Sequence, residues 1–262
     1  MAIYNQIGVG YDLSRQADPQ LLDIMARLLM LRECGAYVDI GCGTGNYTVE
    51  LSRLGGKWSA FDQSELMIAE AKLKSSGIGW GVCDVERTIY KQNSFHAALC
   101  SLAIHHFQNL ESAFSEVARI LYPSGRFVIF TSTPEQMQGY WLNHYFPQML
   151  ARSMAQMPSK NKIEKALAQA KLELVGYETY DVSKELKDLF LYSGKFKPEI
   201  YLSASVRAGI SSFRNFCSDE ELKEGLQRLS MDIYSGAIHK LIQQYENNIG
   251  DYIFVVAEKP GK

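Results

Sequence analysis

The sequence predicts an α/β protein whose central sheet is mainly parallel. Short apolar segments alternate with amphipathic segments from about residue 36 to residue 131, which is the pattern of parallel strands covered by helices. The first apolar segment runs directly into three glycines at alternate positions, Gly41, Gly43 and Gly45. Glycine lets a backbone turn sharply and approach a ligand without a side chain in the way. We therefore expect a strand, a ligand-binding loop and a helix in immediate succession.

The spacing of these glycines and the residue before them narrow the choice of ligand. In the dinucleotide-binding fingerprint the third glycine comes three residues after the second, whereas here Asn46 occupies that place. A phosphate P-loop is excluded because no Gly-Lys-Ser/Thr sequence follows. A carboxylate at Asp39, just before the loop, would repel a pyrophosphate and attract a cation. The electrostatics favour S-adenosylmethionine, which carries an ammonium and a sulfonium, over NAD; a plain strand-to-helix turn is the alternative.

Two further apolar segments also end in acidic residues. Asp62 follows the glycine loop by about 20 residues, where a carboxylate can accept hydrogen bonds from both ribose hydroxyls. Ser64 is a predicted N-cap of the next helix, with Met67 at its N3 position. Asp84 ends the next segment and could accept a hydrogen bond from the exocyclic amine of adenine. In a purely structural interpretation, Asp62 caps a strand end and Met67 belongs to the core.

The remaining elements complete a seven-stranded pattern. The fourth apolar segment, 95–107, is uninterrupted, which is typical of a central strand paired on both sides. A helix is expected before the first strand, at 20–31. After the fourth strand, the pattern predicts a helix at 111–121, a strand at 126–131, a helix at 163–170, a strand at 174–180 and a last strand at 251–257.

These segments resemble the motifs of class I S-adenosylmethionine-dependent methyltransferases, in particular the small-molecule branch called type 11. The first motif is matched by residues 39–45, the ribose and adenine motif by 62–67, and the turn before the fifth strand by 118–126, with Ser124 replacing one glycine. His96 stands where the family usually has Asp. The resemblance implies a doubly wound, seven-stranded, mostly parallel sheet of the Rossmann-like methyltransferase fold, in which the seventh strand inserts antiparallel between the fifth and sixth.

The same resemblance implies S-adenosylmethionine as the cofactor and assigns its contacts. Met67 would pack on the adenine face, and the backbone amide of Val85 would read the ring. The carbonyls of Ser101 and Leu102 would receive the methionine ammonium, while Arg15 would lie near the methionine carboxylate. A surface N-terminal helix is the alternative for that last segment. The expected cofactor-binding residues are Tyr11, Arg15, Asp39, Gly41, Gly43, Gly45, Asp62, Gln63, Met67, Asp84, Val85, Ser101 and Leu102.

Three segments fall outside the sheet and are interpreted as cap elements of a single domain, 1–262. They are residues 1–19, 132–160 and 184–249. The last two are rich in Tyr, Trp and Phe, and loops that close on a rigid scaffold commonly carry substrate choice. The aromatic side chains suggest a bulky, partly apolar methyl acceptor. Alternatively, they form a small core belonging to the cap itself.

Two histidines are the catalytic candidates. Methyl transfer from a sulfonium depends mainly on alignment, and a general base can assist. His105 and His106 follow the fourth strand, and an unperturbed imidazole can accept a proton near neutral pH. Structural capping or substrate positioning is the alternative for both residues.

Composition limits the partners and the compartment. The formal net charge of −2 argues against a nucleic-acid surface, which would show a clustered basic stripe. The five cysteines have no metal-binding spacing, so we expect no metal and reduced thiols in a cytoplasmic protein. No apolar run approaches the ~20 residues that span a bilayer.

The sequence therefore predicts an enzyme that methylates a small molecule, with secondary metabolism as one setting. It would act without nucleic acid or membrane, as a monomer or homodimer. One alternative is an RNA or protein methyltransferase, although no Asn/Asp-Pro-Pro-Tyr sequence follows the fourth strand. Another is a nicotinamide-dependent oxidoreductase.

Overall fold

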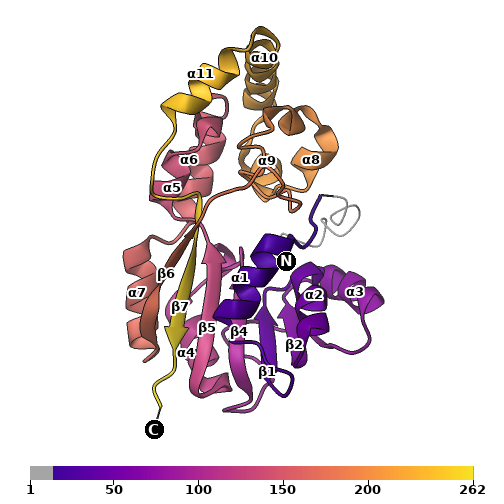
Figure 1. Cartoon of the computed structure of the whole chain (residues 1–262), viewed down its shortest axis with the longest axis vertical. Coiled ribbons are helices and arrows are strands. Elements are labelled where there is room, and N and C mark those ends of the chain that lie inside the picture. Colours follow the sequence, from indigo (N-terminus) through magenta and orange to yellow (C-terminus); the bar gives the residue numbers. More distant parts are fainter. Residues whose placement is uncertain (1–13, 262) are drawn as a thin grey trace.

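A seven-stranded sheet forms the centre of the protein, whose computed structural model describes residues 14–261 (Figure 1). The strands are β1 (Ala36–Ile40), β2 (Lys57–Asp62), β3 (Gly79–Val82), β4 (Phe95–Ser101), β5 (Leu121–Thr131), β6 (Glu173–Tyr180) and β7 (Tyr252–Glu258). Their order across the sheet is β3-β2-β1-β4-β5-β7-β6. Strands β1 to β5 pair in parallel, and β7 is antiparallel to both β5 and β6. The expected doubly wound order and the inserted last strand are both confirmed.

Helices cover both faces of the sheet. The helices that alternate with the strands are α1 (Pro19–Leu28), α2 (Asn46–Leu54), α3 (Glu65–Lys74), α4 (Leu110–Ile120) and α7 (Lys160–Gln169). Successive residues of a strand point to opposite faces, so Tyr37 packs in the same core as Leu21 and Leu51 of α1 and α2. Val38 packs in the other core, with Phe114 of α4 and other residues of α4 and α7. The central strands are therefore buried on both sides, as an uninterrupted apolar sequence predicts.

Two predicted elements end earlier than expected. α1 stops at Leu28, and Met30 then takes a left-handed conformation with φ of 51°. β4 stops at Ser101 because Leu102 has φ of 52°, and the apolar run continues as the short 3₁₀ helix η3 (Ile104–His106). The predicted strand at 95–107 was therefore too long, since buried residues in a 3₁₀ turn carry the same apolar signal as a strand.

A helical cap lies beyond one end of the sheet, the end toward which the parallel strands point (Figure 1). It is built from two of the three segments expected outside the sheet, 132–160 and 184–249. The first supplies α5 (Pro134–Gln138), η4 (Trp141–His144) and α6 (Pro147–Gln156). The second supplies η5 (Pro198–Leu202), α8 (Ala204–Ala208), α9 (Ser211–Phe216), α10 (Asp219–Ser235) and α11 (Ala237–Gln244).

Most of the cap aromatic side chains form a core of the cap itself. Trp141, Tyr145, Phe146 and Tyr201 are all buried and belong to one apolar cluster. That cluster continues into the sheet through residues such as Phe130. Within residues 14–261, no helix is both long enough and apolar enough to cross a membrane.

Candidate functional site

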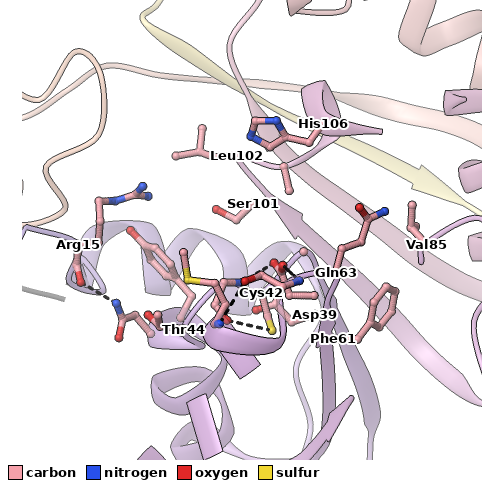
Figure 2. Close-up of a pocket in the computed structure, with 18 of the residues that line it drawn as sticks. Arg15, Asp39, Cys42, Thr44, Phe61, Gln63, Val85, Ser101, Leu102 and His106 are labelled. Atoms are coloured by element: carbon pink, nitrogen blue, oxygen red, sulfur yellow. Dashed lines mark hydrogen bonds between the residues drawn. The ribbon is translucent and has the colours of Figure 1, made fainter. Parts of the chain in front are cut away.

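A cavity of about 320 Å³ opens at the carboxyl ends of β1, β2 and β4 (Figure 2). Six chain segments line it: the N-terminal residues before α1, the glycine loop and the start of α2, the turn from β2 into α3, the residues just after β3, the chain from the end of β4 through η3, and the loop that carries Asp188. In Figure 2, Arg15 lies at one side, Gln63 and Val85 at the other, and His106 lies across the cavity from Asp39 and Cys42. This is the edge of the sheet at which open α/β folds bind their ligands.

The glycine loop forms the base of the cavity. Gly41 and Gly43 have φ of +68° and +54°, a region that L side chains seldom adopt. A Cβ at Gly41 would lie 2.7 Å from the Cβ of Ala103, so this position has no room for a side chain. Apart from its chain neighbours, a Cβ at Gly43 would meet no atom of residues 14–261 within 4 Å, and Gly43 lines the cavity. The space beside Gly43 is thus open to a ligand rather than filled by the fold.

Asp39 is a buried carboxylate with one unused oxygen. Its Oδ2 accepts a hydrogen bond from Thr48 Oγ1 at 2.5 Å, and its Oδ1 is buried with no hydrogen-bond partner among residues 14–261. Burial raises the pKa of Asp39 to about 7, and the neighbouring Asp62 carboxylate adds to the rise. A ligand cation or hydrogen-bond donor would satisfy Oδ1 and favour the ionised form.

Asp62 fixes the turn from β2 into α3. Its Oδ2 accepts from the Gly43 amide at 3.0 Å and its Oδ1 from the Ser64 amide at 2.9 Å. Burial raises the pKa of Asp62, and these amide bonds oppose the rise. Each oxygen can still accept a further hydrogen bond. Ser64 Oγ accepts from the Met67 amide at 3.3 Å, which confirms the predicted N-cap, and Met67 lines the cavity.

The N-terminal segment is tied across the cavity by a loop of the cap. Arg15 forms an ion pair with Asp188, whose side chain is only 1% exposed. Tyr47 of α2 donates to the same carboxylate at 3.1 Å. Two backbone amides complete the junction: Lys187 donates to Asp18 Oδ2 at 3.0 Å and Leu189 donates to the carbonyl of Ser14 at 2.9 Å. Arg15 lines the cavity as expected, and its charge is already matched by a buried partner.

A second cavity of about 100 Å³ lies between the sheet and the cap. It shares Arg15, Leu102 and His106 with the first cavity. Among the cap aromatic residues, Tyr140 and Phe190 line it. Because Leu102 contacts both cavities in a left-handed conformation, the strained residue after β4 stands at their junction.

The two histidine candidates differ in position. His106 lines both cavities, whereas His105 lines the second alone. Their ring centroids are 3.8 Å apart. His106 is an exposed residue at the cavity mouth, yet the protein around its ring removes enough water to lower its pKa to about 4. The pKa of His105 is held well below its usual range by burial and by the neighbouring His106. Both rings are therefore neutral near pH 7 and can each offer one acceptor nitrogen and one N–H.

Most of the expected cofactor residues line the first cavity, but two do not. Gly45 is packed against Trp80, whose ring a Cβ at this position would meet at 2.3 Å, so it serves the turn into α2. Asp84 is exposed and accepts from the Glu86 amide at 2.9 Å. Tyr11 lies outside the described residues. The expected residues that do line the cavity are Arg15, Asp39, Gly41, Gly43, Asp62, Gln63, Met67, Val85, Ser101 and Leu102.

Sequence reasoning missed several residues of the site. Thr48 and Tyr47 lie on α2 and hold Asp39 and Asp188, and Cys42 lies within the glycine loop itself. Thr48 follows Asp39 by nine residues, so its helical position after the loop was the signal that could have found it. Asp188 carries no local signal. Within the part of the chain that the structure describes, no cluster of His, Cys, Asp and Glu could hold a metal ion.

Comparisons with known proteins agree with this geometry. Residues 38–129 match a family model described as a methyltransferase domain. The chain is 31% identical over 104 residues to the ubiquinone/menaquinone biosynthesis C-methyltransferase of Desulfotalea psychrophila, covering 38% of this chain and 42% of that protein. It is 29% identical over 180 residues to the malonyl-[acyl-carrier protein] O-methyltransferase of Erwinia pyrifoliae, covering 66% and 63%. The matched region is less than two thirds of the length of either relative.

Similarity to a solved structure extends over nearly the whole chain. A protein of Anabaena variabilis, described as a methyltransferase from an antibiotic biosynthesis pathway, superposes with a TM-score of 0.83 at 29% identity. The match covers 93% of this chain and 98% of that one. The cap is therefore included in the likeness.

Proposed function

We propose that this chain, which belongs to the class I S-adenosylmethionine-dependent methyltransferases, transfers a methyl group to a small-molecule acceptor. The observation that carries the proposal is the glycine loop beside Asp39, where an open space adjoins a buried carboxylate oxygen without a partner. The likeness to a protein from an antibiotic pathway supports secondary metabolism as the setting. The cytoplasmic location stays a prediction.

The residues around the first cavity fit the cofactor. Gly43 leaves room for a ligand close to the backbone, and the unused oxygen of Asp39 suits a cationic group. Asp62 would accept from the ribose hydroxyls while keeping its two amide bonds. Met67 and Val85 would enclose the adenine. Bound S-adenosylmethionine supplies a methyl group on a positively charged sulfur, which is already activated for attack.

The protein's part in the reaction is chiefly alignment and exclusion of water. Two adjoining cavities that share Leu102 and His106 would hold the methyl donor and the acceptor against one another. Such positioning can lower a barrier by roughly 7–11 kcal/mol in favourable cases. His106, at the junction, is neutral near pH 7 and can accept a hydrogen bond from the acceptor and orient it.

Calorimetric titration tests the assignment directly. S-adenosylhomocysteine should bind the purified protein with a defined stoichiometry, and NADH should give no binding heat. Asp62→Ala should weaken S-adenosylhomocysteine binding by about 1–3 kcal/mol, because the ribose hydroxyls lose an acceptor. Binding of NADH without S-adenosylhomocysteine would instead support the oxidoreductase alternative and overturn the proposal.

A further inference from the structure

We propose that the second cavity binds a small acceptor that carries an anionic group, paired with Arg214, and a neutral hydrogen-bonding group held between His105 and Ser153. The inference deepens the proposed function and rests on it, since it assigns the acceptor side of the same site. It also narrows the acceptor suggested by the aromatic residues, because the second cavity, at about 100 Å³, has less than a third of the volume of the first, at about 320 Å³.

The second cavity is placed where an acceptor must lie. It shares Arg15, Leu102 and His106 with the larger cavity, so its occupant would meet a ligand of the glycine loop at these residues. One wall comes from the sheet end, through η3, and the other from the cap, through α6 and α9. An occupant would therefore contact both the end of the sheet and the cap.

Two buried polar atoms face this cavity without partners. Ser153 of α6 is 1% exposed, and its Oγ has no hydrogen-bond partner among residues 14–261. The Nδ1 atom of His105 is also buried and has no hydrogen-bond partner among these residues. Leaving a buried polar group without a hydrogen bond is unfavourable, and native proteins keep few such groups. A hydroxyl of the acceptor, or an amine in its uncharged form, could donate to one of these atoms and accept from the other, so that both would have a partner.

The charges around the cavity favour an anion. Its described lining contains two arginines and no Asp or Glu. Arg15 is already paired with Asp188, whereas no ion pair or side-chain hydrogen bond of Arg214 is found within residues 14–261. The two histidines add no positive charge, since burial lowers the pKa of both. A carboxylate or a phosphate could each form two parallel hydrogen bonds with the Arg214 guanidinium.

The remaining lining is apolar and limits the rest of the acceptor. Met137, Met157, Phe190 and Ile210 contribute to it. These residues would contact a short carbon skeleton between the anionic group and the hydrogen-bonding group. The substrate class is thus a small hydroxy or amino acid, or the corresponding phosphate ester.

The test compares matched small molecules on protein that holds S-adenosylhomocysteine. A fragment set contains hydroxy and amino carboxylic acids, their uncharged amides, and phosphate esters of equal length, and affinities are measured by ligand-observed NMR. Members with an anionic group should bind wild-type protein more tightly than their amides. The carboxylate and phosphate arms show which anion the site takes.

Three variants locate the contacts. Arg214→Gln should weaken the anionic fragments about tenfold or more and leave the amides unchanged. Arg87→Gln is the matched control, because Arg87 is exposed, lines neither cavity and removes the same charge. Ser153→Ala should weaken every fragment about fivefold or more without lowering the melting temperature of the empty protein, since its hydroxyl has no partner to lose.

The outcomes separate this inference from the proposed function. All three variants should keep wild-type affinity for S-adenosylhomocysteine, because none of the three residues lines the first cavity. Failure of wild-type protein to bind S-adenosylhomocysteine would overturn the function itself. If S-adenosylhomocysteine binds but anionic fragments gain nothing over their amides, or respond equally to the Arg214 and Arg87 variants, only the acceptor assignment is overturned.

Discussion

At the scale of single residues, Gly43 tests whether the first cavity holds the cofactor, because it lines that cavity and has open space beside its Cα. Gly43→Ala should weaken S-adenosylhomocysteine binding at least tenfold, because the new methyl group would enter the cavity without meeting a side chain of residues 14–261. The left-handed φ should also lower the free energy of unfolding by about 1–2 kcal/mol. Calorimetry and urea denaturation measure the two effects.

Gly236→Ala provides the matched control. Gly236 has φ of +78°, its Cβ would also meet nothing within 4 Å, and it lies in the cap between α10 and α11. It should lose similar stability and keep wild-type affinity. Equal loss of affinity in both variants would mean that the Gly43 effect arises from strain in the backbone and not from a filled cavity.

Asp39 should link cofactor binding to pH. Its pKa is raised to about 7 in the folded protein and is near 3.9 when unfolded, so the folded state holds its proton more tightly. This contribution to stability is fully present below about pH 4 and is lost as pH rises to about 7. A bound cation favours the carboxylate, so binding at pH 6 should release up to about one proton.

Titrations in two buffers of different ionisation enthalpy measure that release. Asp39→Asn removes the titrating group while keeping an oxygen that can accept from Thr48. Its binding should release fewer protons, and its stability should fall less between pH 4 and 7. An unchanged proton release would assign the linkage to another group, such as the neighbouring carboxylate of Asp62.

Local sequence spacing found the residues whose place depends on one strand end. Asp39 and Asp62 lie in the last two residues of β1 and β2, and Met67 follows in the first turn of α3, so the sequence pattern gives their positions. Asp188 and Ser153 could not be found in this way. Asp188 lies 141 residues from Tyr47, its hydrogen-bond partner, and only the folded chain brings them together.

At the scale of elements, the loop that holds Asp188 anchors the N-terminal segment. Asp188→Asn should lower the free energy of unfolding by about 3 kcal/mol, because it leaves the Arg15 guanidinium with a neutral partner in a mostly buried place. The freed segment should also weaken S-adenosylhomocysteine binding. Urea denaturation, calorimetry and hydrogen exchange at the Leu189 amide, which donates to Ser14, measure the change.

Asp181→Asn is the matched control for this element. Asp181 is an exposed partner of Lys195 at 3.6 Å, and surface ion pairs contribute about 0–1 kcal/mol. Its stability and its exchange at Leu189 should match those of the wild type. If the Asp188 variant also matches the wild type in both measurements, the N-terminal segment is held by its backbone bonds alone.

Element boundaries were predicted less well than element order. The sequence placed every strand, yet the strand predicted at 95–107 ends at Ser101 and the helix predicted at 20–31 ends at Leu28. In both cases a left-handed residue, Leu102 or Met30, stops the element while the apolar pattern continues. Hydrophobic periodicity indicates which residues are buried. It cannot show that the backbone of one residue turns into the left-handed conformation.

At the scale of the whole molecule, the cap and the sheet share one apolar cluster. Phe130 and Phe254 of the sheet belong to the same cluster as Trp141 and Tyr145 of the cap. We therefore propose that residues 14–261 unfold as a single domain. The order of the strands followed from the family resemblance, whereas the helices α8 to α11 had no prediction, because aromatic content alone indicates burial without a period.

Cooperative unfolding can be measured with a single fluorescent reporter. The chain has three tryptophans. Replacing Trp58 and Trp80 by Phe leaves Trp141, which lies in the cap, as the single fluorescent reporter. Urea transitions followed by its fluorescence and by far-UV circular dichroism should have the same midpoint. A fluorescence transition at clearly lower urea would show that the cap unfolds separately.

The insertion of β7 between β5 and β6 affects how the chain folds during synthesis. Among the described strands, β6 pairs with β7 alone, and Tyr252 is made 72 residues after Tyr180. At about 5–20 residues per second, the ribosome needs roughly 4–14 seconds for that stretch. Throughout this interval the outer edges of β5 and β6 are both unpaired, and such edges readily join other chains. Aggregation of newly made protein should therefore start by pairing of β5 or β6 with another chain. The glycine loop and the cavities should take no part in that first step.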